Sequence, residues 1–483
     1  MSTVRRIAKN TAVLFVAHIF IALLGLLLSI IIARKLGDVT FGKYSFALAF
    51  TALFAVLPLG FDTLLARNVA RDKSLAPKYL GNLVIIKAIL SFVIFGLIAL
   101  IINLMDYPHD TTIAVLIFSI YVVFTALAGT FKMAFQAYER MELTALVTIA
   151  RRLVIVSLGL AAIFLGYGLI TIASVFAIAG MLDLILSFSI CGKKFAKPKI
   201  EIDIDFWKKA ARVALPLTFV PLAAIIYTRI DMVMLSAMKG DAVVGWYNAS
   251  YSLVLALQFI PTVFLTALSP LMAQFFISSQ DSLKAVYEKS IRYLFIIGLP
   301  IAAGATLLAH RVIPLFFGSQ FTNSITALQI LAWDILLFFL YRPLLYVLFN
   351  MDKEKQIAVV AGACAVMNVL LNLALIPSLS YVGAGIATIA TETILLGAYF
   401  YLVSKYLYRL PIRKTIGKPL IACAIMAVFV YFCNCINLAA LIVSAAVLYF
   451  VMLYLFKEFS QEDVDLLKQA VRISKFGAFP FER

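Results

Sequence analysis

An arginine and an aspartate lie two residues apart in a hydrophobic stretch long enough to cross a membrane. Arg229 and Asp231 fall within residues 210–235. A charge at that depth costs about 2.5–3.5 kcal/mol per residue on insertion scales. On a regular helix the two side chains point roughly opposite ways, so they are not expected to pair with each other. The chain is therefore expected to handle a charged solute inside the bilayer, unless these charges only join neighbouring helices.

Other carboxylates lie in apolar segments as well. Asp183 and Glu392 lie well inside theirs, and Glu392 is about 14 Å in from Gly383 at 1.5 Å per helical residue. A buried carboxylate is paired, protonated or bound to a cation. We therefore expect Asp231, Glu392, Asp183 and Asp62 to serve either in coupling to H⁺ or Na⁺ or in pairing with basic side chains.

The composition is that of a membrane protein. Of the 483 residues, 64% are hydrophobic and 13% are charged, and the mean hydropathy is +1.04. A soluble domain carries about 25% charged residues. The five cysteines and three histidines show no metal-binding spacing, so we expect neither a metal nor another cofactor. The first apolar run, residues 11–33, is too long for the core of a signal peptide and predicts a retained helix.

Hydrophobic segments predict an all-α protein with about fourteen transmembrane helices. A bilayer core needs about 20 apolar residues per helix, and backbone exposed to lipid must bond within its own segment. The predicted spans are 11–34, 44–66, 82–104, 112–135, 146–166, 169–191, 212–236, 245–277, 291–315, 325–349, 356–376, 383–405, 418–436 and 438–456. The long eighth segment is expected to tilt, or to bend at Pro261 and Pro270.

The distribution of positive charge predicts the orientation. With the N-terminus in the cytoplasm, 32 of the 41 Lys and Arg residues fall on the inner side, 5 on the outer side and 4 within spans. This asymmetry places both termini in the cytoplasm. It also excludes nucleic acid as the reason for the net charge of +17, because the charge is spread over many short loops. The basic segment 193–212 is expected to touch anionic membrane lipids.

An internal repeat organises the chain. The pattern Gly-Asp-x-x-x-Gly-x-Tyr occurs at residues 37–44 and again at 240–247, each time after a predicted span. The pattern Gly-x-Gly-x-x-Thr-Ile-Ala occurs at 166–173 and 383–390. Six helices return the chain to its starting side, so the copies are parallel. Two parallel halves with a site between them are the plan of a transporter that works by alternating access.

The expected organisation is therefore two lobes in pseudo-two-fold repeat plus two extra helices. Its parts are an N-lobe at 1–192, a cytoplasmic basic linker at 193–212, a C-lobe at 213–410, helices thirteen and fourteen at 411–456, and a cytoplasmic amphipathic tail at 457–483.

Several of these segments resemble a known family. Residues 10–44, the pattern G-F-D-x-x-L-x-R-x-x-A-R at 60–71, and R-x-D-x-x-M-L at 229–235 resemble polysaccharide flippases of the Wzx type. These belong to the multidrug/oligosaccharidyl-lipid/polysaccharide exporter superfamily. The resemblance implies a flippase that carries a polyprenyl- or dolichyl-(di)phosphate-linked oligosaccharide to the outer leaflet. Related lipid II flippases have an Arg-Asp pair where this chain has Leu28 and Ser29, which argues against the peptidoglycan precursor.

That substrate suggests roles for particular side chains. Arginine contacts phosphate in a bidentate manner and stays ionised when buried, so Arg229 and Arg342 are the leading phosphate contacts. Arg67 is a candidate for substrate entry. The structural alternatives are that Arg342 packs at a helix kink and that Arg67 snorkels to the membrane interface. Tyr247 and Asn248 are candidates for binding sugar, although membrane aromatics more often anchor at the interface.

Other functions are less well supported by the residues. The loops are short and hold no nucleophile or acidic metal motif, which disfavours a membrane-embedded enzyme of the same pathway. An ion-coupled multidrug exporter of the superfamily is the main alternative, and an acidic cavity would favour it. No filter-like repeat supports a channel. The expected partners are the lipid-linked oligosaccharide, membrane lipids and glycan-assembly proteins of the same pathway.

Overall fold

The computed structural model describes residues 3–199, 201–410 and 412–458, and this part of the chain contains helices and no strands. The helices are α1 (Thr3–Ala55), α2 (Leu59–Arg71), α3 (Ala76–Leu104), α4 (His109–Ala137), α5 (Met141–Phe164), α6 (Leu169–Lys194), α7 (Ile204–Lys239), α8 (Asp241–Leu257), α9 (Phe259–Ser278), α10 (Gln280–Phe317), α11 (Ser324–Asn350), α12 (Glu354–Tyr406), α13 (Ile412–Phe432) and α14 (Leu438–Leu455). The predicted tail helix lies outside the described residues.

The predicted membrane fold is confirmed. Eleven helices in the described chain are long and apolar enough to span a bilayer. Two of them, α1 and α12, each change direction at one non-helical residue, Gly37 and Ser380. Helix α12 contains two predicted spans, and α1 contains the first predicted span and the first half of the second. With the shorter apolar helix α13, the helices match the fourteen predicted spans.

Two predicted spans are interrupted part-way along their length. The second predicted span breaks between α1 and α2, and the eighth breaks at Gln258, between α8 and α9. The expected bends at Pro261 and Pro270 are therefore wrong as to position. Pro261 lies in the first turn of α9, where its missing N–H would have no intrahelical acceptor, so the helix starts just before it.

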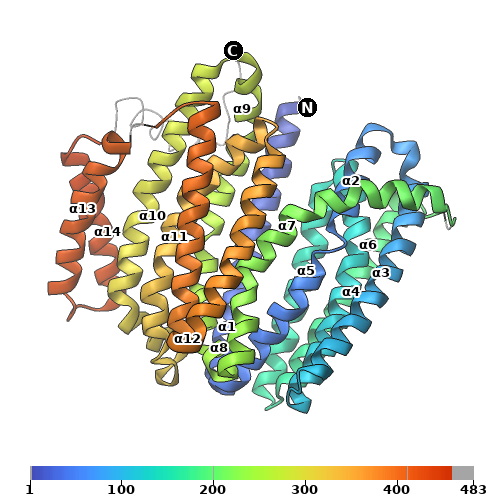
Figure 1. Ribbon diagram of the computed structural model, residues 1–483, viewed down its shortest axis with the longest axis horizontal. Coiled ribbons are helices and arrows are strands. Elements are labelled where there is room, and N and C mark those ends of the chain that lie inside the picture. Colours follow the sequence, from blue (N-terminus) through green and yellow to red (C-terminus); the bar gives the residue numbers. More distant parts are fainter. Residues whose placement is uncertain (1–2, 200, 411, 459–483) are drawn as a thin grey trace.

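The helices form two lobes that stand side by side (Figure 1). In one lobe α4 packs against α3 and α6, and α5 packs against α1 and α6. In the other, α11 packs between α10 and α12, and α12 packs against α7. Helices α13 and α14 pack on α10 at the far edge of the second lobe. The lobes meet chiefly where α1 contacts α8, near the lower end in Figure 1.

Helix α7 connects the lobes. Its N-cap residue, Asp203, accepts a hydrogen bond from the backbone N–H of Phe206 at 2.9 Å and forms an ion pair with Lys78 at 2.7 Å. The hydrogen-bonded ammonium of Lys78 and, to a lesser extent, the N–H of Phe206 lower the pKa of Asp203. The first turns of α7 then pack on the N-lobe, where Ala210 and Ala214 share an apolar cluster with α2, α3 and α4. Half of the predicted linker is therefore helical, and the exact lobe boundary stays a prediction.

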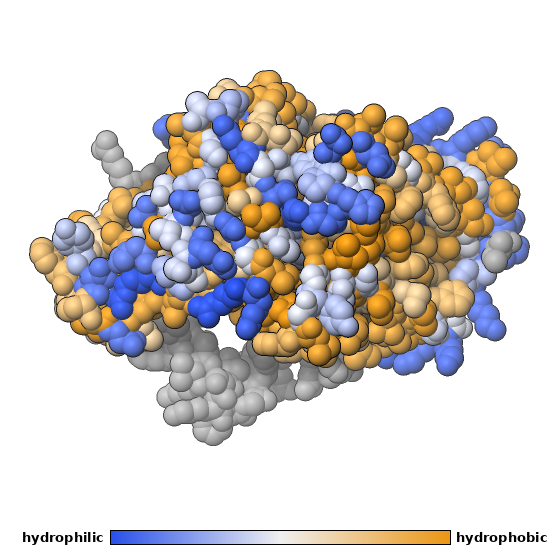
Figure 2. Space-filling view, turned by 90° about the horizontal axis from the view of Figure 1, so that it is seen from below, coloured by the Kyte–Doolittle hydropathy of each residue, from blue (hydrophilic) through white to orange (hydrophobic). Residues whose placement is uncertain are grey.

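The surface matches a helix bundle surrounded by lipid. Many large apolar side chains are exposed along the helices, such as Phe92 and Tyr431. Figure 2 views the molecule from the lower end of Figure 1, where hydrophilic residues gather between hydrophobic flanks. Helices in lipid gain little from burying apolar surface against one another, so close backbone packing and polar contacts decide where they touch.

Candidate functional site

The lobes contact each other through the two copies of the repeated motif. We call this contact the outer junction (residues 33–48 of α1 and 236–248 of α7 and α8). A Cβ atom on Gly42 would lie 1.7 Å from the carbonyl oxygen of Asp241, and one on Gly245 would lie 2.2 Å from that of Asp38. Both contacts are with backbone and require glycine. The motif thus marks a reciprocal crossing of α1 and α8.

The backbone turns that create the crossing are also alike in the two lobes. Gly37 has φ 83° and ψ 175°, and Gly240 has φ 87° and ψ 173°. These positive φ angles favour glycine, which has no Cβ. The same turn therefore starts the second helix of each hairpin, and it sets both motifs at one end of the molecule.

Hydrogen bonds between lobes reinforce the outer junction. They run from Trp246 Nε1 to Asp38 Oδ2 at 2.9 Å, from Asn248 Nδ2 to Ser45 Oγ at 2.7 Å, from Tyr107 to Ser236 at 3.0 Å, from Gln320 to the carbonyl of Ala33 at 3.0 Å, and from Arg34 to the carbonyl of Leu315. Asn248, a predicted sugar contact, is engaged in the junction in this conformation. The lobes are closed at this end.

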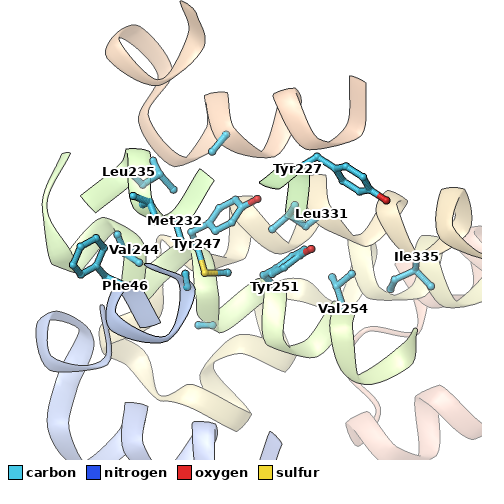
Figure 3. Packing of buried hydrophobic residues seen from close by; sticks show 14 of the residues in the cluster. Phe46, Tyr227, Met232, Leu235, Val244, Tyr247, Tyr251, Val254, Leu331 and Ile335 are labelled. Atoms are coloured by element: carbon cyan, nitrogen blue, oxygen red, sulfur yellow. The ribbon is translucent and has the colours of Figure 1, made fainter. Parts of the chain in front are cut away.

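Next to the outer junction, Asp231 lies in a buried hydrogen-bond network of the C-lobe. It accepts from the Tyr247 hydroxyl and from the backbone N–H of Met232 at 2.8 Å, and Tyr247 also lies 3.1 Å from the Thr388 hydroxyl. Figure 3 shows Tyr247 and Tyr251 one after the other along α8, with their rings stacked. Asp231 is 1% exposed, so its carboxylate depends on neutral hydrogen-bond donors.

Two more buried acids of the C-lobe have no ion-pair partner among the described residues. Asp334 accepts from Gln258 at 3.0 Å, and its Oδ1 has no partner in the described chain. Glu392 is 4% exposed, and no described residue bonds to its Oε2. Arg342 attracts Glu392 electrostatically but bonds only to the Thr262 hydroxyl at 3.4 Å, and its guanidinium lies 4.9 Å from the ring centroid of Phe338. Its Nε is buried without an acceptor.

Arg229 is half-buried and makes no hydrogen bond or ion pair with the described residues. As expected from their spacing, Arg229 and Asp231 do not pair. Arg229 lies ten residues from the end of α7, about 15 Å along the helix, which is half the depth of a bilayer core. Arg67 is exposed on α2, away from these groups. The phosphate and entry roles of these side chains stay predictions.

In the N-lobe the acids are paired with bases. Asp62 bonds to Lys87 at 2.7 Å, with both side chains almost fully buried. Asp183 bonds to Lys132 at 2.9 Å and to Arg151 at 3.1 Å. Lys87 does not snorkel to the interface, because Asp62 compensates its charge inside the lobe. For Asp62 and Asp183 the pairing alternative describes this conformation.

The two lobes therefore treat charge differently. Asp62 and Asp183 inside the N-lobe form ion pairs, whereas among the described residues Asp231, Asp334 and Glu392 in the C-lobe have only neutral hydrogen-bond donors or an oxygen without a partner. Because low-dielectric surroundings penalise an uncompensated carboxylate, the C-lobe acids can take up a proton or a cation.

Three charges inside the lobes were not predicted from the sequence. Asp334 lies in the same span as Arg342, and the count of loop charges assigned Arg151 and Arg152 to the inner side although they lie mid-way along α5. In each case a charge within an apolar segment was the available signal. In the part of the chain that the structure describes, no group of three acidic, His or Cys side chains could hold a metal ion.

An apolar cavity of about 520 Å³ lies beside the polar network. It is bounded by α1, α8, α10, α11, α13 and α14, and its lining, which includes Leu253, Pro300, Val430 and Ala445, is almost entirely apolar. A chain of methylene or isoprene units would displace few polar groups there. The extra helices thus complete a space suited to lipid.

Sequence comparison identifies the family. The sequence model of "Polysaccharide biosynthesis protein" matches residues 7–276, more than half of the chain. The chain belongs to this family. The MatE model also matches residues 216–374, within the C-lobe.

Two curated relatives match along most of the chain. One is "Capsular polysaccharide biosynthesis protein CapF" of Staphylococcus aureus, 24% identical over 81% of this chain and 98% of its own length. The other is "Probable flippase AglR" of Haloferax volcanii, 22% identical over 88% of this chain and 89% of its own length.

Solved structures share the fold. The lipid II flippase MurJ in an inward closed conformation aligns with a TM-score of 0.76 over 92% of this chain and 98% of that one, at 17% identity. An inward-facing multidrug resistance MATE family transporter aligns with a TM-score of 0.67 over 80% and 95%, at 16% identity. These likenesses support a two-lobe helical transporter fold.

Proposed function

We propose that this protein is a flippase that moves a polyprenyl- or dolichyl-(di)phosphate-linked oligosaccharide from the inner to the outer leaflet. The observation that carries the proposal is the presence of guanidinium groups without a carboxylate partner, Arg229 and Arg342, inside a protein of the polysaccharide biosynthesis family. Phosphate is the complement that such groups lack. The names of the relatives CapF and AglR agree with this substrate class.

Transport by alternating access fits the arrangement of the lobes. The outer junction closes one end, so the substrate would enter from the other end and leave when the junction opens. The head group would cross between the lobes, while the lipid chain would occupy the apolar cavity beside α13 and α14. The protein would perform no covalent chemistry on the glycan.

The C-lobe acids are the candidate coupling groups. Asp231 and Glu392 can exchange a proton or a sodium ion, because neither is compensated by an ion pair. Asp183 and Asp62 would have a structural role, since each is paired with a basic side chain. The distribution of Lys and Arg supports the proposal that the protein lies in the cell membrane with both termini in the cytoplasm. Its partners would be glycan-assembly proteins of the same pathway.

A drug exporter is the second candidate, because the MatE model matches the lobe that holds the uncompensated acids. The two functions differ in the charge of the substrate. Anionic lipid phosphate requires free guanidinium groups, whereas a cationic drug would pair with Asp231, Asp334 or Glu392.

The test is flipping of a fluorescent polyprenyl-diphosphate oligosaccharide in proteoliposomes by the wild type, by Arg229→Ala and by Lys284→Ala. Lys284 is the matched control because its ammonium lies at the surface, paired with Asp281 at 2.9 Å. Flipping by the wild type and the control, with loss in Arg229→Ala, would support the substrate and the phosphate role. Equal flipping by all three would make Arg229 structural. Absence of flipping together with extrusion of a cationic dye would support the drug exporter.

A further inference from the structure

Among the described residues of the N-lobe, Arg152 is a half-buried arginine that no acid compensates. Arg152 lies eleven residues into α5, about 16 Å from its inner end and therefore near mid-membrane. Its Nε donates to the carbonyl of Ile21 on α1 at 3.3 Å. Within the described ranges no carboxylate reaches it, although its neighbour Arg151 bonds to Asp183 at 3.1 Å.

The guanidinium group of Arg152 lies against the backbone of α1. A Cβ atom on Gly25 would lie 1.8 Å from Nη2 and 3.0 Å from Cζ of Arg152. Gly25 thus leaves the space that the planar group occupies. Since a lone charge at this depth is costly, a side chain that is positioned but not neutralised is ready for a ligand.

Two tyrosines, Tyr44 and Tyr121, lie on α1 and α4, which are among the helices that pack against α5. Their rings both pack on Phe176, at centroid distances of 6.1 and 5.5 Å. Tyr44 is the tyrosine of the first repeated motif, 5% exposed, and it makes no hydrogen bond to the described residues. A phenol and a guanidinium offer N–H and O–H donors, and what the group lacks is an anionic acceptor.

The repeat itself shows that the N-lobe lacks the acid found beside the motif tyrosine of the C-lobe. In the C-lobe the equivalent tyrosine, Tyr247, donates to Asp231, which lies nine residues before Gly240. In the N-lobe the residue nine before Gly37 is Leu28, which is buried and apolar. The tyrosine of the motif therefore bonds to an acid in the C-lobe, whereas the matching position before the motif in the N-lobe holds no acid.

We propose that Arg152 binds a phosphate group of the transported lipid in the N-lobe. The proposal rests on the proposed function and adds a second anion contact, since Arg229 lies at a similar depth in the C-lobe. A diphosphate could then be held from both lobes. Arginine suits the role because it stays ionised and offers two parallel N–H donors to phosphate oxygens.

The test is equilibrium binding of a fluorescent polyprenyl diphosphate to the purified full chain in nanodiscs. Arg152→Gln should raise the Kd at least tenfold. Arg151→Gln is the matched control, because the adjacent arginine is already paired with Asp183, and it should change the Kd less than twofold while lowering the thermal unfolding temperature. Gly25→Ala retains Arg152 but displaces its flexible guanidinium, and it should weaken binding severalfold without unfolding the protein.

Inorganic pyrophosphate separates recognition of phosphate from recognition of the lipid. It should compete with the labelled lipid on the wild type, and the competition should be weaker with Arg152→Gln. If Arg152→Gln does not fold, Arg152→Lys supplies the test, since it retains charge but loses the bidentate geometry and should bind more weakly. A Kd for Arg152→Gln or a folded Arg152→Lys equal to that of the wild type would overturn the proposal.

Flipping by the wild type distinguishes the two levels of inference. If the wild type flips the lipid and Arg152→Gln binds and flips equally well, the phosphate role of Arg152 fails and the proposed function stands. If the wild type neither binds nor flips any diphosphate lipid, the proposed function itself fails.

Discussion

Replacing Gly42 with alanine should open the outer junction. The new methyl carbon would lie 1.7 Å from the carbonyl oxygen of Asp241, whereas real Cβ atoms stay at least 3.0 Å from such an atom. The obstacle is backbone, so no side-chain rotation relieves it, and α8 must move away from α1 by more than an ångström. Hydrogen bonds of the length seen across the junction do not survive such a shift.

The magnitude follows from the bonds that would be lost. Five hydrogen bonds join the lobes here, and each polar contact between membrane helices is worth about 0.6 kcal/mol. Their loss would cost roughly 3 kcal/mol, which corresponds to about a hundredfold change in the ratio of closed to open junctions. The substitution should therefore populate an outward-open state and slow flipping.

Distances between spin labels at Val39 and Met238 would measure the change, because both side chains are exposed near the junction on opposite lobes. Exposed Cys435 would be replaced first. Gly96→Ala in α3 is the control, since a Cβ there would meet no atom within 4 Å. An unchanged distance distribution in Gly42→Ala, with flipping equal to that of Gly96→Ala, would refute the reasoning.

Three further predictions concern buried charge and the cavity. Lys87→Met should lower the free energy of unfolding by about 3–5 kcal/mol in thermal or chemical denaturation, because it leaves Asp62 buried and unpaired. Adding Asp62→Leu should restore most of the lost stability. A double variant as unstable as the single one would contradict the pairing. Asp183→Asn should destabilise by a similar amount, whereas Asp334→Asn should cost less than about 1 kcal/mol, since only an amide bonds to Asp334; equal losses in the two would contradict the difference between the lobes. Ala445→Phe should fill the apolar cavity and slow flipping of long-chain lipids while leaving the unfolding temperature within a few degrees, and unaltered flipping would show that the lipid chain lies elsewhere.

The number of membrane helices and the repeat could be predicted because both depend on short, local stretches of sequence. An apolar segment must satisfy its own backbone hydrogen bonds, so its length predicts a helix wherever its neighbours lie. The Gly-Asp motif at 37–44 and 240–247 also requires the same local turn in both lobes. The break at Gln258 was missed, because proline was expected to bend a helix rather than to stand in its first turn.

The pairing of charges could not be predicted in the same way. Asp62 and Lys87 are 25 residues apart and come together only when α2 and α3 pack. From the sequence, each was a lone charge near the membrane edge, where snorkelling costs little. The sequence also contains no sign that Arg151 would find Asp183 while Arg152 would not, since adjacent helical residues point in different directions.

The reciprocal crossing at the outer junction has a consequence for the history of the chain. Gly42 contacts the carbonyl of Asp241, and Gly245 contacts that of Asp38. Each copy of the motif therefore supplies both a glycine and the backbone carbonyl that packs against the other copy's glycine. This is the geometry of an isologous interface, the self-complementary surface that joins the two subunits of a symmetric homodimer. Half of this protein would carry all that is needed to bind a second half. A duplicated gene could therefore have begun as a dimer of six-helix chains, and at this joint neither copy can change its glycine without disturbing the other.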